Sequence, residues 1–182
     1  MKGVIFLEFL ALVEDKFGLD VADDIIESST LESNAAYTSV GTYPFSEMVS
    51  LVTSLSERSG VSIPDLLQVY GEHLLGRFVA RYPVHFEGVD STFELLEKLD
   101  NTIHVEVLKL YPEAELPRFN PNRVAPHVLE MNYRSDKPLT MLAYGLIAGC
   151  AGHFGENIDI EMDDRSDEAQ TNVTFTLTKV AA

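Results

Sequence analysis

The sequence has little of what nucleic-acid-binding and disulfide-stabilised proteins require. Its 182 residues carry 13 Lys and Arg against 29 Asp and Glu, which gives a formal net charge of −16. Phosphate backbones are bound by clustered cations, so we expect no nucleic-acid partner. The same charge repels anionic membrane surfaces. A single cysteine, Cys150, excludes an internal disulfide framework and suits a reducing compartment.

Long apolar runs are also missing. No run reaches the ~18 apolar residues that a membrane-spanning helix requires. The apolar start of the chain is interrupted by Glu8, and Glu14 and Asp15 stand where a signal peptide would have its small-residue cleavage site. We therefore expect a cytoplasmic protein without a signal peptide and without membrane contact.

The familiar catalytic motifs are absent as well. The sequence contains no glycine-rich phosphate loop, His-Glu-x-x-His, Cys-x-x-Cys or Gly-x-Ser-x-Gly. Cys150 and His153 are close enough on a predicted helix to share a metal ion. Because no second cysteine is available, we interpret Cys150 as a buried small hydrophobic side chain. We expect that the protein is not an enzyme.

What the sequence does contain is a helical first part and a β-rich last part. Apolar residues make up 46% of the chain, enough for a buried core, and we predict a single α+β domain over 1–182. It combines a helical N-terminal part with a small antiparallel sheet and a packed helix. Spacing predicts helices over 2–17, 20–28, 46–58 (capped by Ser46 and ended by Gly60), 62–80 (starting at Ser62), 90–111 and 138–153, and strands over 118–122, 128–133, 157–162 and 171–179. The core stripe of the helix over 90–111 ends with Leu110, and Val173, Phe175 and Leu177 alternate with threonines, so the last strand has one buried face.

His104 is the residue whose surroundings point to chemistry. It precedes Pro112 by about two helical turns, on a face shared with Val107, Leu108 and Tyr111. A neutral imidazole among apolar neighbours suits an axial ligand of haem iron, because the porphyrin is buried against hydrocarbon. The pattern is also typical of a hydrogen-bonded histidine at the edge of a helical core. On this residue alone, the second interpretation is favoured.

Other segments along the whole chain favour the interpretation of His104 as a haem ligand. They are Met1-Lys2-Gly3, Tyr70-Gly71-Glu72, Ile103-His104, Leu108-Lys109-Leu110-Tyr111-Pro112, Leu116-Pro117, the run from Leu129 to Lys137, and Gly145-Leu146-Ile147. With them the chain resembles, from end to end, the H-NOX (haem–nitric oxide/oxygen binding) family in its bacterial stand-alone form, related to the haem domain of soluble guanylate cyclase. The resemblance implies haem b (iron protoporphyrin IX), buried between the helical part and the sheet, with His104 as the proximal iron ligand.

The family binds the haem propionates with a Tyr-x-Ser-x-Arg motif. Tyr133 and Ser135 match its first two places, and Lys137 stands where the arginine is expected. Hydroxyls two residues apart in a strand point the same way and can reach one pair of carboxylates. The ammonium group of a lysine is a mobile point charge, whereas an arginine can bind a carboxylate through two parallel hydrogen bonds. Arg134 cannot replace it, because in a strand it would point to the opposite face. The resemblance therefore implies that this chain binds the haem propionates more weakly than is usual for the family.

The remaining haem contacts also follow from the resemblance. Pro117 presses against the porphyrin in the family. Members that bind oxygen stably have a tyrosine at the position of Leu142, and a leucine cannot donate a hydrogen bond to bound oxygen. Tyr144 lies about 200° further round the helix and is expected to face elsewhere. The distal positions implied are Ile5, Phe9, Leu74, Phe78, Leu142 and Leu146.

Three functions remain open from the sequence. The first is a haem-based gas sensor for nitric oxide, which also binds carbon monoxide and regulates a separate histidine kinase or diguanylate cyclase. The second is a haem-free or weakly haem-binding interaction module of the same fold, which Lys137 makes plausible. The third is an enzyme such as a haem peroxidase, for which the distal positions offer no acid or base. We expect the first.

Overall fold

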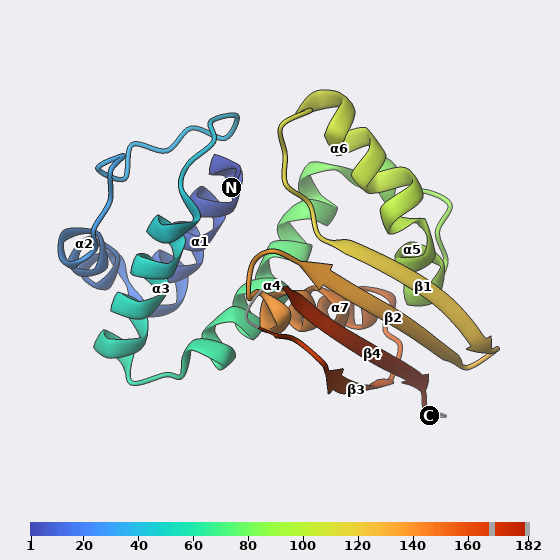
Figure 1. Ribbon diagram of the computed structural model, residues 1–182. Coiled ribbons are helices and arrows are strands. Elements are labelled where there is room, and N and C mark those ends of the chain that lie inside the picture. The colour runs from blue at the N-terminus through green and yellow to red at the C-terminus, as the bar shows by residue number, and fades with distance from the viewer. Residues whose placement is uncertain (168–169, 181–182) are drawn as a thin grey trace.

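The structure, a computed structural model that describes residues 1–167 and 170–180, has the predicted α+β fold with the helices first (Figure 1). Two short turns interrupt the helical part, a 3-10 turn at Pro83–His85 and a π turn at Leu99–Ile103. No helix within the described ranges is long and apolar enough to cross a membrane. The helices are α1 (Gly3–Phe17), α2 (Leu19–Ser28), α3 (Phe45–Ser59), α4 (Ile63–Arg81), α5 (Thr92–Lys98), α6 (His104–Leu110) and α7 (Thr140–Phe154), and the strands are β1 (Arg118–Ala125), β2 (Val128–Ser135), β3 (Ile158–Asp164) and β4 (Thr171–Lys179).

The four strands form one antiparallel sheet in the order β1-β2-β4-β3. In β4, Val173, Phe175 and Leu177 are fully buried, while the threonines between them are partly exposed. This is the alternation that the sequence predicts for a strand with one buried and one solvent-exposed face. The register pairs Tyr133 of β2 with Phe119 of β1 and with Val173 of β4. Aromatic residues of neighbouring strands therefore meet on the buried face.

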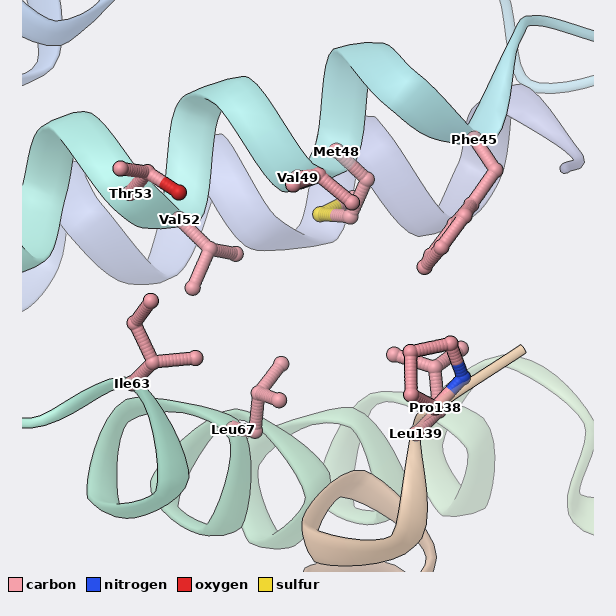
Figure 2. A pocket seen from close by; sticks show the side chains of 9 residues that line it. All are labelled: Phe45, Met48, Val49, Val52, Thr53, Ile63, Leu67, Pro138 and Leu139. Atoms are coloured by element: carbon pink, nitrogen blue, oxygen red, sulfur yellow. The ribbon is translucent and has the colours of Figure 1, made fainter. Parts of the chain in front are cut away.

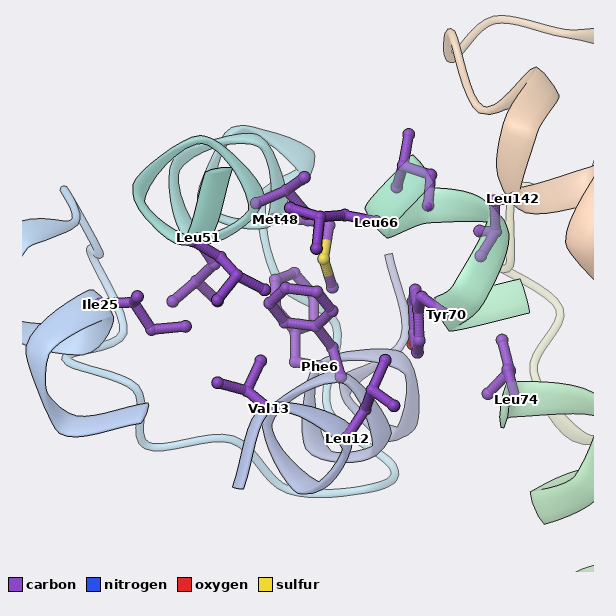
Figure 3. Close-up of a cluster of buried hydrophobic side chains, with 14 of the residues drawn as sticks. Phe6, Leu12, Val13, Ile25, Met48, Leu51, Leu66, Tyr70, Leu74 and Leu142 are labelled. Atoms are coloured by element: carbon purple, nitrogen blue, oxygen red, sulfur yellow. The ribbon is translucent and has the colours of Figure 1, made fainter. Parts of the chain in front are cut away.

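Two groups of buried side chains form the core. The helical cluster lies among α1–α4 and the start of α7 and contains Phe6, Phe9, Leu51 and Tyr70 (Figure 3). The sheet cluster joins α5 and α7 to the sheet. Leu146 packs against both clusters, so the middle of α7 is the place where they meet. Buried members of the sheet cluster include Phe93, Phe119, Leu129, Met131, Tyr133, Ile147, Cys150, Val173 and Phe175.

Helices α4 and α7 are in direct backbone contact at two glycines. A Cβ atom on Gly145 would lie 2.0 Å from the carbonyl oxygen of Gln68, and one on Gly71 would lie 2.4 Å from that of Leu142. Both distances are far below a van der Waals contact, so only glycine permits this crossing. It brings the side chains that follow Gly71 on α4 close to those around Gly145 on α7.

The predicted helix over 90–111 is not one continuous α-helix. It consists of α5, the π turn and α6, and the backbone N–H of His104 donates to the carbonyl oxygen of Leu99 rather than to that of the next residue. Leu110, which the helical spacing assigns to the core, is 71% exposed. The π turn contains Asp100, whose side chain binds both His104 and strand β1. The π turn places Asp100 where it makes both contacts, and helical spacing in the sequence does not predict such a turn.

The predicted helix caps are confirmed in two cases and wrong in one. Ser62 caps α4, and its Oγ accepts a hydrogen bond from the Asp65 backbone N–H at 3.3 Å. Gly60 ends α3 in the left-handed region at φ 73°. Ser46, however, lies inside α3, because the helix begins one residue earlier at Phe45, after Pro44 with φ −56°. Proline fixes a φ that suits a helix start, so no serine cap is needed.

Gly145→Ala should lower the free energy of unfolding by about 1–3 kcal/mol, the usual cost of overpacking, because the new methyl group meets backbone rather than a flexible side chain. The matched control is Gly152→Ala in the same helix, where no atom lies within 4 Å of the added Cβ. This control should gain about 0.4–1 kcal/mol from the lower entropy of the unfolded chain. Urea unfolding of both variants checks the prediction, and equal effects would contradict the close crossing.

Candidate functional site

His104 is the first residue of α6, directly after the π turn. Its side chain is only 16% exposed, and its ring centroid lies 6.3 Å from that of Phe119. Burial lowers the pKa of His104, while the charge and the hydrogen bond of Asp100 act in the opposite direction without cancelling the effect. The ring is therefore neutral at pH 7, which is the form that binds iron.

Asp100 is a residue of this site that the sequence reasoning missed. Its Oδ1 lies 2.9 Å from Nδ1 of His104, and its Oδ2 accepts the backbone N–H of Phe119 at 2.6 Å. A carboxylate can only accept, so Nδ1 carries the proton and Nε2 is the ring nitrogen left for a metal. The signal in the sequence was the spacing of four residues between an acidic side chain and the histidine on one helix.

The six predicted distal residues all belong to the helical cluster. Phe9, Leu74 and Leu142 are buried, and the others pack against them. Figure 3 places Leu74 and Leu142 beside Tyr70, at the side of the cluster where α4 and α7 meet. The hydroxyl of Tyr70 donates to the carbonyl oxygen of Ile5. Tyr144 packs against the sheet cluster instead, so it faces away from Leu142 as expected.

The hydroxyls of Tyr133 and Ser135 lie on the same side of β2. The Tyr133 ring is 2% exposed and packs against the rings of Phe119 and Phe175, with centroid distances of 5.0 and 6.1 Å. Burial raises the pKa of Tyr133, and a hydrogen bond with Ser135 partly offsets this. The Ser135 hydroxyl also accepts the backbone N–H of Lys137 at 3.0 Å. The structure thus brings together the first two residues of the predicted propionate motif.

Lys137 forms an ion pair with Glu115, and its side chain is 17% exposed. Glu115 lies between α6 and β1, in the loop that also carries Pro117 just before β1. A second lysine, Lys2, reaches Glu113 of the same loop at 2.9 Å. Arg134 is exposed on the other face of β2, as predicted. Lys137 lies just after β2, and its side chain, unlike that of Arg134, is largely buried.

Other parts of the chain offer weaker sites. Cys150 is buried, as predicted, and burial raises its pKa to about 12. Across the described ranges, no three His, Cys, Asp or Glu side chains group so as to hold a metal ion. An apolar cavity of about 140 Å³ lies between α3 and α4, closed at one end by Pro138 and Leu139 (Figure 2). It is smaller than the ~300–1,000 Å³ of typical ligand pockets, and none of the predicted haem residues lines it.

The donor chemistry of these residues fits a haem. A neutral imidazole with its Nδ1 held by a carboxylate is what an axial iron ligand requires. The distal residues supply hydrocarbon, and Tyr133, Ser135 and Lys137 supply donors suited to carboxylates. An apolar surface, one ring nitrogen and a small group of donors are the three things that a haem needs from its protein.

Comparisons with known proteins agree with this chemistry. A family model described as haem-NO-binding (HNOB) matches residues 2–162. The chain is 42% identical to an Fe(II) unliganded H-NOX protein from K. algicida, with a TM-score of 0.93 and with 100% of this chain and 98% of that chain covered.

Two further solved structures extend the match. An H-NOX from Shewanella woodyi, in the Fe(II)CO state with IWP-051 bound, is 37% identical, with a TM-score of 0.85 and coverage of 99% and 95%. An H-NOX protein from S. oneidensis in the Fe(II)NO state is 27% identical, with a TM-score of 0.87 and coverage of 98% and 100%. No curated protein matches. The chain therefore belongs to the haem-NO-binding family and is an H-NOX domain, the haem-based gas-sensor domain that its residues imply.

Proposed function

We propose that the protein senses nitric oxide, holds haem b (iron protoporphyrin IX) through His104, and regulates a separate histidine kinase or diguanylate cyclase. The observation that carries the proposal is the His104 ring, which is neutral, mostly buried and held at Nδ1 by Asp100. Relatives in Fe(II)CO and Fe(II)NO states support the choice of ligands. The acidic chain suits a partner with a basic docking surface.

His104 couples the gas to the fold in this proposal. His104 would hold the haem, whose iron would supply the position at which nitric oxide binds. On release from the haem, His104 would shift together with α6, while Asp100 of the π turn stays bound to β1. A sensor needs such an element with two arrangements that the ligand biases differently. Pro117, in the loop that follows α6, would press against the bound haem and would relax at the same time.

The distal residues account for the choice of gas. None of the six distal side chains carries a hydrogen-bond donor. The two nearby tyrosines are engaged elsewhere, since Tyr70 donates to the carbonyl oxygen of Ile5 and Tyr144 packs in the sheet cluster. Bound oxygen gains negative charge and depends on a donor for stability, whereas nitric oxide and carbon monoxide depend on one much less. Leu142 thus favours the latter two gases.

His104→Ala should remove the intense Soret band of protein that is expressed with sufficient haem, because the iron loses its protein ligand. Added imidazole should restore the band by entering the space of the lost ring. Absorption spectra of the purified wild type and variant check this. His153→Ala is the matched control, since His153 is exposed and should leave the spectrum unchanged. An unchanged spectrum in His104→Ala would end the assignment, and a colourless wild type would favour the haem-free module.

Reduced wild-type protein should bind nitric oxide and carbon monoxide but form no lasting complex with oxygen in air. Leu142→Tyr should make an oxygen complex persist, because its hydroxyl is placed in a cluster that otherwise has no free donor. Leu142→Phe adds a ring of similar size without the hydroxyl and serves as the control. Absorption spectra recorded after exposure to air distinguish these outcomes. A stable oxygen complex in the wild type would show that a donor has been missed.

The propionate site predicts an order of haem-loss rates. A hydrogen bond to a charged group contributes about 1.5–3 kcal/mol, so Tyr133→Phe and Ser135→Ala should each speed haem loss about tenfold or more. Lys137→Ala should have a smaller effect, because the mobile ammonium group of lysine binds a propionate less strongly. Lys137→Arg should slow haem loss, because a guanidinium group can bind a carboxylate through two hydrogen bonds. Haem transfer to excess apomyoglobin measures all of these rates. Rates equal to that of the wild type throughout would rule out this segment as the propionate site.

A further inference from the structure

Asp100 is a charged and mostly buried residue whose effect on the iron the proposed function leaves undefined. Its side chain is 21% exposed, and both of its carboxylate oxygens are engaged. Oδ1 meets the Nδ1 of His104 at 2.9 Å, while Oδ2 accepts the backbone N–H of Phe119 at 2.6 Å. The carboxylate therefore cannot turn away from His104 without giving up its bond to β1. Its position is fixed by the sheet.

A fixed carboxylate changes the imidazole that it touches. Accepting the Nδ1 proton fixes the tautomer and the ring orientation, and it makes Nε2 a better electron donor to a metal. A charged acceptor forms a stronger hydrogen bond than a neutral one, so the effect exceeds that of a backbone carbonyl at the same place. The π turn carries Asp100, His104 follows it as the first residue of α6, and Phe119 of β1 lies against the His104 ring. Three elements thus converge on one hydrogen bond.

We propose that Asp100 is a positioning residue that sets the strength of the bond between His104 and the haem iron. It thereby sets how readily nitric oxide releases His104. The inference rests on the proposed function, because it requires His104 to be the iron ligand. Asp100 strengthens the bond and so delays release. When release occurs, the same carboxylate keeps the ring tied to β1.

The test compares Asp100→Asn with the wild type as ferrous haem-loaded proteins. The variant keeps the shape of the side chain and removes its charge. The iron–histidine stretching frequency in resonance Raman spectra should fall, and the midpoint potential should rise, because a weaker donor stabilises ferric iron less. Nitric oxide should remove His104 from the iron faster. Haem loss should be about 10–100-fold faster, as is usual when such a supporting residue is changed.

Glu106→Gln is the matched control. It removes the same charge from α6, the helix that follows the π turn, but Glu106 is 47% exposed and pairs with Lys109 at 2.7 Å rather than with His104. This variant should keep the wild-type frequency, potential and haem-loss rate. A change equal to that of Asp100→Asn would mean that net charge, rather than the hydrogen bond, controls the iron, and the proposal would be overturned.

The outcomes separate this proposal from the proposed function. If His104→Ala loses the Soret band but Asp100→Asn keeps the wild-type frequency and potential, then His104 is the ligand and the role of Asp100 is wrong. If His104→Ala keeps the wild-type spectrum, the proposed function fails first.

A second test uses the wild-type protein alone. In the ferrous carbon monoxide state, the Nδ1 proton of His104 should exchange slowly with solvent in NMR spectra, and rapid exchange would overturn the proposal.

Discussion

The direct backbone contact between α4 and α7 is the constraint on which the rest of the structure depends. Two glycines, Gly71 and Gly145, allow the helix axes to approach more closely than any side chain would permit. The helical cluster and the sheet cluster meet at this crossing, through Leu146. The distal residues of α4 and α7 owe their shared surroundings to it. A wider crossing would separate the two clusters and, with them, the two faces of the proposed haem site.

In the proposed haem site, the proximal side is organised by hydrogen bonding rather than by packing. One carboxylate, that of Asp100, holds the imidazole of His104 and the first residues of β1 together. The distal side, in contrast, consists of hydrocarbon from three helices. This asymmetry suits a sensor. A uniform apolar face accepts small neutral gases, and a directional polar contact on the other face keeps the His104 ring in a defined place.

Local signals in the sequence predicted much of the fold, and contacts between distant segments account for what was missed. The alternation in β4 and the ends of helices at Ser62 and Gly60 are properties of neighbouring residues, and they are confirmed. The π turn was not predicted, because the contact of its Asp100 with β1 lies outside the helix. The same holds for Asp100, since only the position of the Phe119 N–H gives its carboxylate a second partner. The proposal that His104 is the iron ligand comes from the family resemblance, since its neighbours in the sequence favour a hydrogen-bonded histidine at the edge of the core.

The burial of Cys150 has a consequence for chemical selectivity under the proposed function. Thiolates, rather than thiols, react with oxidants and nitrosating species, and a pKa of about 12 leaves almost no thiolate at neutral pH. The chain has no other cysteine. The folded protein therefore offers nitrogen oxides no reactive thiol, and S-nitrosation of Cys150 would not compete with the iron for nitric oxide.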